Sequence, residues 1–200
     1  MATRLLRVLP ALAIATLAAC NDVPTGHEEG APAPSYARGD DPAARGDNSP
    51  AVAVYRVALE PLNDSGVTGD VTLLVKGGEL VVRLNAVGHV AGRLHPQHIH
   101  GFTDTASSCP TAAQDTDGDG IITIGEGSAA FGPVQVDLQA YPTPANAGGA
   151  IHYTRSFDLA TVPFEPADLT AKTVVLHGAF VGDGYVASLP VACGAVVAVN

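Results

Sequence analysis

The stretch Leu94-His95-Pro96-Gln97-His98-Ile99-His100 decides how this chain is interpreted. It holds three of the seven histidines in the 200-residue sequence. Side chains two positions apart in a β-strand point to the same face, so His98 and His100 would present two imidazoles to one metal ion. Imidazole suits copper, zinc, iron and nickel. The alternative is a surface strand that is rich in histidine by chance.

The sequence around this stretch favours short strands separated by glycine and proline. Strand-like runs occupy residues 52–59, 70–75, 79–84, 134–138, 150–157, 174–181 and 195–199. Lys76-Gly77-Gly78 lies between two of them and is typical of a hairpin. No long helical period occurs. We therefore expect residues 51–200 to form an all-β domain, a Greek-key antiparallel β-sandwich or barrel.

A second motif, from Asp115 to Glu126, fits the calcium loop of EF-hand proteins position for position. The expected ligands are the side chains of Asp115, Asp117, Asp119 and Glu126 and the backbone carbonyl of Ile121. The glycines that follow argue against an exit helix, so we expect a structural calcium loop inserted between strands. The alternative is an acidic surface turn that binds no ion.

The N-terminus is typical of a secreted bacterial lipoprotein. Arg4 and Arg7 precede an apolar run, residues 8–17, that is too short to span a bilayer. Leu17-Ala18-Ala19-Cys20 then resembles a lipobox. We expect a signal peptide over residues 1–19, an acylated Cys20 held in a lipid bilayer, and a disordered tether over residues 20–50. The alternative is an ordinary signal peptide that leaves Cys20 free.

Charge and cysteine content narrow the function further. Without the signal peptide, eight basic residues remain against twenty acidic ones, a formal charge of −12. This charge disfavours nucleic acids and anionic membrane surfaces as partners. With Cys20 acylated, Cys109 and Cys193 are left as a pair, which outside the cytoplasm is a candidate disulfide. The alternative is two reduced, buried thiols.

Four segments, taken in order, resemble the Cu/Zn superoxide dismutases over roughly residues 52–200. Leu94 to His100 is similar to that family's L-H-x-x-H-x-H strand, and Cys109 follows at the family's spacing. Lys172-Thr173-Val174-Val175-Leu176-His177 is similar to R-T-x-V-V-H, and Ala192-Cys193-Gly194 is similar to the A-C-G that carries the partner cysteine. The resemblance implies the same fold and a Cys109–Cys193 disulfide.

The same resemblance implies that His98, His100 and His177 are copper ligands. His95 would orient a ligand and not bind the metal, because metal-bound imidazoles usually donate their other N–H to a partner. His152 is a candidate fourth ligand, and the alternative is a structural role on its predicted strand. His89 and His27 receive no role.

The chain departs from the family in two places that bear on activity. No histidine occurs between Cys109 and His152, so the zinc site and its bridging imidazolate are expected to be absent. Pro190 stands where the family has an arginine that steers superoxide. We therefore expect a membrane-anchored, extracytoplasmic lipoprotein, on the periplasmic side or the cell surface, that binds copper and calcium and has weak or no dismutase activity.

Two alternatives remain open. The chain would be a copper-only superoxide dismutase if activity survives without zinc. It would instead be a non-catalytic, calcium-binding β-sandwich if no transition metal binds. The second alternative is favoured by a resemblance to chordin-type (CHRD) domains in His98-Ile99-His100-Gly101, Gly132-Pro133-Val134 and Gly148-Gly149-Ala150-Ile151. In that interpretation the histidines form hydrogen bonds inside a turn.

Overall fold

The computed structural model describes residues 52–138 and 145–199. The predicted signal peptide, Cys20 and the tether lie outside these residues. The described part is mostly strands: β1 (Ala53–Pro61), β2 (Thr68–Lys76), β3 (Glu79–Val87), β4 (Gln97–His100), β5 (Val134–Asp137), β6 (Ile151–Asp158), β7 (Thr173–Val181), β8 (Gly184–Ala195) and β9 (Val197–Val199). It also contains the helix α1 (Ile124–Phe131) and the 3₁₀ turns η2 (Ala112–Gln114), η3 (Leu159–Thr161) and η4 (Pro166–Ala171). Within these ranges, no helix combines the length and the apolar character needed to cross a bilayer.

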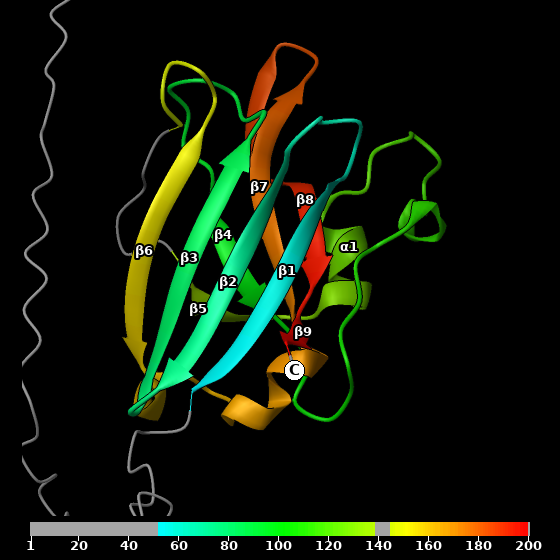
Figure 1. Cartoon of the computed structure of the whole chain (residues 1–200). Coiled ribbons are helices and arrows are strands. Elements are labelled where there is room, and N and C mark those ends of the chain that lie inside the picture. The colour runs from blue at the N-terminus through cyan, green and yellow to red at the C-terminus, as the bar shows by residue number, and fades with distance from the viewer. Residues whose placement is uncertain (1–51, 139–144, 200) are drawn as a thin grey trace, which may run out of the picture. The chain divides into compact units, whose positions relative to one another are not determined.

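The strands form one antiparallel sheet that curls into a half-barrel. Their order is β5-β4-β7-β8-β1-β2-β3-β6, and β9 pairs with β1 beside this path. β1 joins the two halves of the sheet, because it pairs with β2 along most of its length and with β8 through Glu60 and Pro61. Figure 1 shows β1, β2, β3 and β6 in front, with β4, β5 and β7 behind them. The prediction of an antiparallel β fold is confirmed, and the described part is mostly β with few helices.

The β2–β3 hairpin forms where the sequence predicts it. Lys76 pairs with Glu79, and Gly77 and Gly78 make the turn with φ angles of 59° and 85°. Positive φ at both central residues is what a two-residue hairpin turn requires, and glycine adopts it without a Cβ clash. Along β3, buried and exposed positions alternate, so one face of the hairpin packs into the interior.

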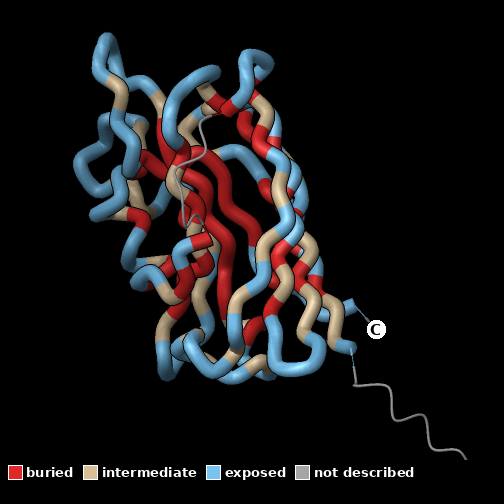
Figure 2. The backbone as a smooth tube through the Cα atoms, turned by 90° about the vertical axis from the view of Figure 1, so that its left-hand side faces the viewer, coloured by how far each residue is buried: buried red, intermediate tan, exposed pale blue. Residues whose placement is uncertain are grey.

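The main core lies between the two halves of the curled sheet (Figure 2). Leu73 and Leu84 from one half belong to the same buried cluster as Ile99 and Leu176 from the other. Side chains also connect the two outer parts of the sheet: the Tyr153 hydroxyl on β6 donates to Gln97 Oε1 on β4 at 2.7 Å. Gln97 is fully buried, so this contact fixes the start of β4 directly before His98.

A second, smaller core lies under α1. It contains Phe131, Val175 and Cys193, with Leu62 and Cys109 packed against it. The predicted disulfide between Cys109 and Cys193 is present, with a Cα–Cα distance of 5.7 Å. It fastens the loop after β4 to β8 beneath the helix.

Two elements differ from the sequence prediction. The expectation that no helix follows the calcium loop is wrong, because α1 begins at Ile124 inside the motif. Thr123 caps this helix: its hydroxyl accepts from the Glu126 N–H and the Glu126 carboxylate accepts from the Thr123 N–H, which offsets the two internal glycines. β8 has 12 residues, and only the last of them, Ala195, was predicted to lie in a strand. Pro190 and the glycines near its ends obscure its strand pattern.

Candidate metal centre

Two neighbouring strands bring the three predicted histidine ligands together. His98 and His100 lie on β4, and β4 pairs with β7 so that Gln97 faces Leu176, the residue before His177. Ile99, between the two β4 histidines, points into the main core and is fully buried. His98 and His100 therefore point to the opposite face, toward the second core and α1. The two-residue periodicity of a strand thus separates the metal-binding side from the packing side.

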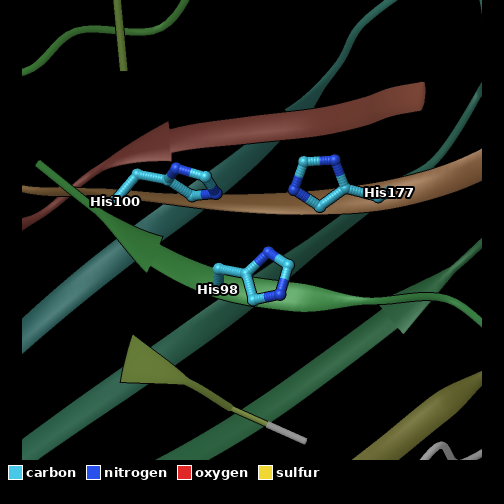
Figure 3. Close-up of side chains that lie close together, drawn as sticks. All are labelled: His98, His100 and His177. Atoms are coloured by element: carbon cyan, nitrogen blue, oxygen red, sulfur yellow. The ribbon is translucent and has the colours of Figure 1, made fainter. Parts of the chain in front are cut away.

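The three rings surround one space between β4 and β7 (Figure 3). One nitrogen of each ring lies within 4.8 Å of the corresponding nitrogens of the other two. The ring centroids are 5.4 Å apart for His98 and His100, 5.1 Å for His98 and His177, and 5.6 Å for His100 and His177. Ligand nitrogens at ~2.0–2.1 Å from one metal ion are about 3.3–3.6 Å from each other, so nitrogens that all lie within 4.8 Å of one another could hold one ion after a small movement of the rings.

Backbone carbonyls determine which nitrogens are free. His100 Nδ1 lies 2.9 Å from the Gly132 carbonyl oxygen, and His177 Nδ1 lies 3.0 Å from that of Ser188. A carbonyl oxygen only accepts, so each Nδ1 carries a proton and donates it. The neutral rings are left with a lone pair on Nε2. His100 Nε2, His177 Nε2 and His98 Nδ1 are buried and have no hydrogen-bond partner.

Burial keeps the three rings neutral. Desolvation is the largest cause that lowers the pKa of His177, to about 3, and that of His100, to about 4, and each of these two pKa values is lowered further by neighbouring imidazoles. Desolvation also lowers the pKa of His98, although the nearby Asp137 carboxylate acts in the opposite direction. Neutral rings at pH 7 do not have to release a proton before they bind a metal ion.

Irregular backbone around His177 shapes this side of the centre. The β7–β8 register shifts on both sides of His177, which pairs with Pro190, a residue without an N–H. The next residue, Gly178, has a φ of 107°, and a Cβ there would lie 2.2 Å from the Tyr185 hydroxyl and 2.8 Å from His95 Nδ1. Only glycine fits at this point, so the residue after His177 is fixed by close packing.

His95 contacts the backbone of His177. Its Nδ1 lies 3.0 Å from the His177 carbonyl oxygen, and its Nε2 lies 2.9 Å from that of Val90. The ring is fully buried. Both nitrogens face protein oxygens, and His95 is not one of the three grouped histidines. This arrangement fits a residue that holds a ligand in place and does not itself bind the metal.

Two other histidines lie apart from the group. His152, the candidate fourth ligand, is exposed on β6, where its Nδ1 is 3.3 Å from Asn85 Oδ1, and the structure does not place it with the other three. His89, which received no role from the sequence, is 95% buried, and neither ring nitrogen has a hydrogen-bond partner. Its ring centroid is 4.3 Å from that of His95, and desolvation, then His95, lowers its pKa to about 4. The glycines that flank His89 in the sequence indicate a loop and do not predict a buried side chain.

A surface pocket of about 300 Å³ adjoins the three rings. All three histidines line it, together with Pro96, Ile124, Val134, Ala187 and Ser188. A metal ion held by the rings would therefore face a hollow large enough for a small molecule. A larger hollow of about 660 Å³ lies over residues 159–168 and involves none of the histidines.

The acidic loop forms a second group of candidate ligands. Asp115, Asp117 and Glu126 each offer a carboxylate oxygen within 4.8 Å of the others, whereas Asp119 is not in this group. The Asp115 carboxylate accepts from the N–H groups of Gly118 and Gly120, at 2.8 and 2.9 Å, and thereby folds the loop around itself. Asp119 Oδ1 accepts from the Ile121 N–H at 2.8 Å. A hard cation that prefers oxygen ligands fits this donor set.

Helix α1 connects the acidic loop to the histidines. Glu126 belongs to the loop and to the first turn of the helix, where N–H and O–H donors from Thr116 and Thr123 lower its pKa to about 2. At the other end, the helix is capped by Gly132, whose carbonyl accepts from His100. Phe131, the last residue of the helix, packs on His100 with a centroid distance of 4.6 Å. The helix that the sequence did not predict therefore positions His100, one of the three grouped histidines, through Phe131 and Gly132.

The acidic loop is also fixed to the sheet through one side chain. Asn63, in the turn after β1, accepts from the Ile122 N–H at 2.8 Å and donates to the Ile122 carbonyl at 2.9 Å. Its amide also donates to the carbonyl of Pro190 in β8 at 2.9 Å. Asn63 thus pairs with the loop as a strand residue would, and no sequence motif indicated this.

Comparison with known proteins gives no family assignment: no protein-family model and no curated protein matches the chain. The likeness to the superoxide dismutases therefore rests on the sequence motifs.

Proposed function

We propose that this chain is a membrane-anchored, extracytoplasmic lipoprotein that binds copper through His98, His100 and His177 and calcium through the 115–126 loop. Two observations together carry the copper proposal: the three rings each offer a nitrogen within 4.8 Å of the others, and each ring has a buried nitrogen without a hydrogen-bond partner. Buried polar atoms without partners are uncommon in proteins, and a shared ligand would explain three of them on grouped rings. The disulfide supports an oxidising compartment outside the cytoplasm.

The donor set fits copper. Three neutral imidazoles suit copper or zinc, and the burial that keeps them neutral favours metal binding at pH 7. When bound, copper would supply a redox-active centre beside the pocket that the three histidines line. In this arrangement His98, His100 and His177 hold the ion, and His95 fixes the backbone of His177.

The proposed fold is that of the superoxide dismutases, with weak or no dismutase activity. Support for the fold comes from the antiparallel half-barrel, the histidine group and the Cys109–Cys193 disulfide. The expectation of weak activity rests on the missing zinc-site histidines and on Pro190 in place of the steering arginine. Among the residues that the structure describes, no lysine or arginine lines the pocket beside the histidines, which also argues against efficient capture of superoxide.

Copper titration of the purified protein tests the site. We expect one equivalent of tightly bound copper in the wild type and its loss in the His98→Ala/His100→Ala double variant. His152→Ala is the matched control, because His152 is exposed and lies outside the group, and it should bind copper like the wild type. Unchanged copper stoichiometry and affinity in the double variant would reject the proposal.

The copper-only dismutase alternative is tested by activity. The copper-loaded protein is assayed for inhibition of the reduction of a dye by xanthine oxidase-generated superoxide. We expect dye reduction to proceed at nearly the same rate as in buffer containing no protein. Strong inhibition of dye reduction that disappears in His177→Ala would favour the enzyme.

One observation favours the CHRD-type alternative: His100 does form a hydrogen bond with Gly132, in a segment that resembles that pattern. The bond uses only Nδ1, and Nε2 remains without a partner. Elemental analysis of protein purified without added metals distinguishes the two functions. Copper together with calcium would agree with the proposal, and calcium without copper or zinc would favour the alternative.

The lipid anchor is proposed from the lipobox alone. Cys20→Ser should move the protein from the membrane fraction to the soluble fraction of producing cells. Cys109→Ser, which leaves the lipobox unchanged, is the control and should stay with the membrane. An unchanged distribution of the Cys20→Ser variant would reject the anchor and leave the metal sites unaffected.

A further inference from the structure

The pocket beside the histidines has an apolar wall. Apart from the three rings, Ile124, Val134, Ala187 and Pro96 form it, with Ser188 as the remaining member. Ile124 and Val134 are 39% and 50% exposed, which is unusual for large aliphatic side chains grouped at one site. A ligand that buries this apolar wall under its own carbon atoms would therefore gain the most binding free energy.

The described part of the chain places no cationic side chain in this pocket to compensate a negative charge. None of the six lysines and arginines in the described ranges lines it. Arg93 stacks on Phe180 and Tyr185, and the Lys172 ammonium donates to the Phe102 carbonyl at 2.7 Å. An anionic group carried into the pocket away from the metal would lose water and gain no ion pair.

The apolar surface continues beyond this pocket. A second hollow of about 270 Å³ shares Ile124 and Ser188 with the first and is lined further by Val181, Val186 and Leu189. Its one charged wall residue is Asp119, from the acidic loop. The two hollows together offer a ligand one end at the histidines and an apolar surface that extends away from them.

We propose that the open coordination position of the histidine site takes a neutral, largely apolar small molecule that carries one metal-binding atom. This inference rests on the proposed function, because it needs the metal at His98, His100 and His177. It assigns a ligand class that differs from a small anion such as superoxide: the metal would hold the donor atom, and the wall formed by Ile124, Val134 and Ala187 would select the rest of the molecule.

Three pyridines test this inference on the copper-loaded protein. Pyridine, 4-ethylpyridine and pyridine-4-carboxylate bring the same donor nitrogen and differ only at the position that would face the wall. Binding is followed by electron paramagnetic resonance and by the visible absorption of copper. Each affinity is divided by the affinity of the same pyridine for a small tris-imidazole copper complex, which removes differences in nitrogen basicity.

We expect 4-ethylpyridine to bind about tenfold more tightly than pyridine, since a buried CH₂ contributes ~0.8 kcal/mol and tenfold corresponds to ~1.4 kcal/mol. Pyridine-4-carboxylate should bind at least tenfold more weakly than 4-ethylpyridine. Corrected affinities within twofold of each other, or tightest binding of the carboxylate, would overturn the inference. Copper stoichiometry is measured first: if no copper binds at the histidines, the proposed function fails and this inference fails with it. If copper binds but the pyridines do not differ, only the inference fails.

A variant pair locates the selective surface. Ala187→Phe fills the pocket and should weaken 4-ethylpyridine binding at least tenfold while one equivalent of copper is retained. Ala198→Phe, an exposed alanine on β9 that does not line the pocket, is the control and should bind 4-ethylpyridine like the wild type. Equal binding by both variants would place the pyridines outside this pocket and reject the assignment.

Discussion

The histidine group and the acidic loop are two candidate metal sites built in opposite ways. The histidines come from two strands, are largely buried, and are oriented by carbonyls of Gly132 and Ser188 outside their own strands. The acidic loop takes its ligands from twelve consecutive residues, is mostly exposed, and is folded by its own N–H groups. The first site depends on the whole fold, and the second depends mainly on local backbone. Changes that disturb packing should therefore affect them unequally.

The largest difference between the two sites is expected in stability, when a methyl group is added next to each of them. Gly178→Ala places a Cβ against Tyr185 and His95 at a φ of 107°, whereas Gly118→Ala has a φ of 76° and no atom within 4 Å. We expect the free energy of unfolding to fall by about 3 kcal/mol for Gly178→Ala and about 1 kcal/mol for Gly118→Ala. Urea unfolding of the metal-free proteins measures both, and equal losses would contradict the comparison.

Removing one charge from the acidic loop should affect calcium and spare copper. Glu126→Gln keeps the size of the side chain and removes the carboxylate that a calcium ion would bind through both oxygens. We expect calcium affinity to fall on the order of 100-fold, with copper stoichiometry unchanged. Isothermal titration measures both ions, and Glu79→Gln, an exposed change in the β2–β3 hairpin, is the control. A loss of copper in Glu126→Gln would show that the two sites are not separable.

The two regions should also respond to acid over different ranges. The pKa of His89, whose ring packs against His95, is lowered from 6.5 to about 4, so the unfolded chain binds protons there that the folded chain does not. Its contribution to stability is complete above pH 6.5 and is lost as the pH falls toward 4. The pKa of Glu126 is lowered from 4.5 to about 2, so its contribution is complete above pH 4.5 and is lost as the pH falls toward 2.

Substitutions at His89 and Glu126 distinguish these two pH ranges. His89→Phe in the metal-free protein should reduce the loss of stability between pH 6.5 and 4 by roughly 1–3 kcal/mol. Glu126→Gln should change the pH dependence only below 4.5. Unfolding free energies at pH 7, 5 and 3 provide the measurement. A His89→Phe profile parallel to the wild type in the upper range would show that the buried ring does not control it.

The smallest expected effect is a coupling between the sites through α1. The helix begins in the acidic loop and ends at Gly132, which holds His100. Binding of calcium should stiffen the first turn and favour the orientation of His100, so copper affinity should rise about fivefold, or roughly 1 kcal/mol. Copper competition titrations with and without calcium measure this rise. Glu126→Gln should abolish it, and a rise that persists in that variant would exclude the loop as its source.

Sequence patterns predicted the parts of this molecule that local periodicity specifies. The two-residue spacing of His98 and His100 placed both rings on one face, and the Gly77-Gly78 hairpin formed as expected. The approach of His177 depends on pairing between β4 and β7, so it was expected only from the resemblance to a known family.

The missed features depend on contacts between distant residues. The prediction that no helix follows the loop rested on the low helix propensity of the glycines, and it did not consider the capping box that Thr123 and Glu126 form at the start of α1. The packing of Phe131 in the second core stabilises the helix, and no local pattern indicates that packing. His152 was a candidate ligand because its strand was recognised, yet the register of β6 leaves its side chain exposed.

The single amide of Asn63 gives the acidic loop the kind of pairing that a second strand would otherwise provide. Within the described ranges no second group of carboxylates accompanies this loop, so its saturation is not linked there to that of a second calcium site. Its occupancy should follow a hyperbolic curve with a Hill coefficient of one and spread over roughly two decades of free calcium. Such a response suits a structural calcium site that stays occupied in a calcium-rich medium and does not suit a cooperative calcium switch.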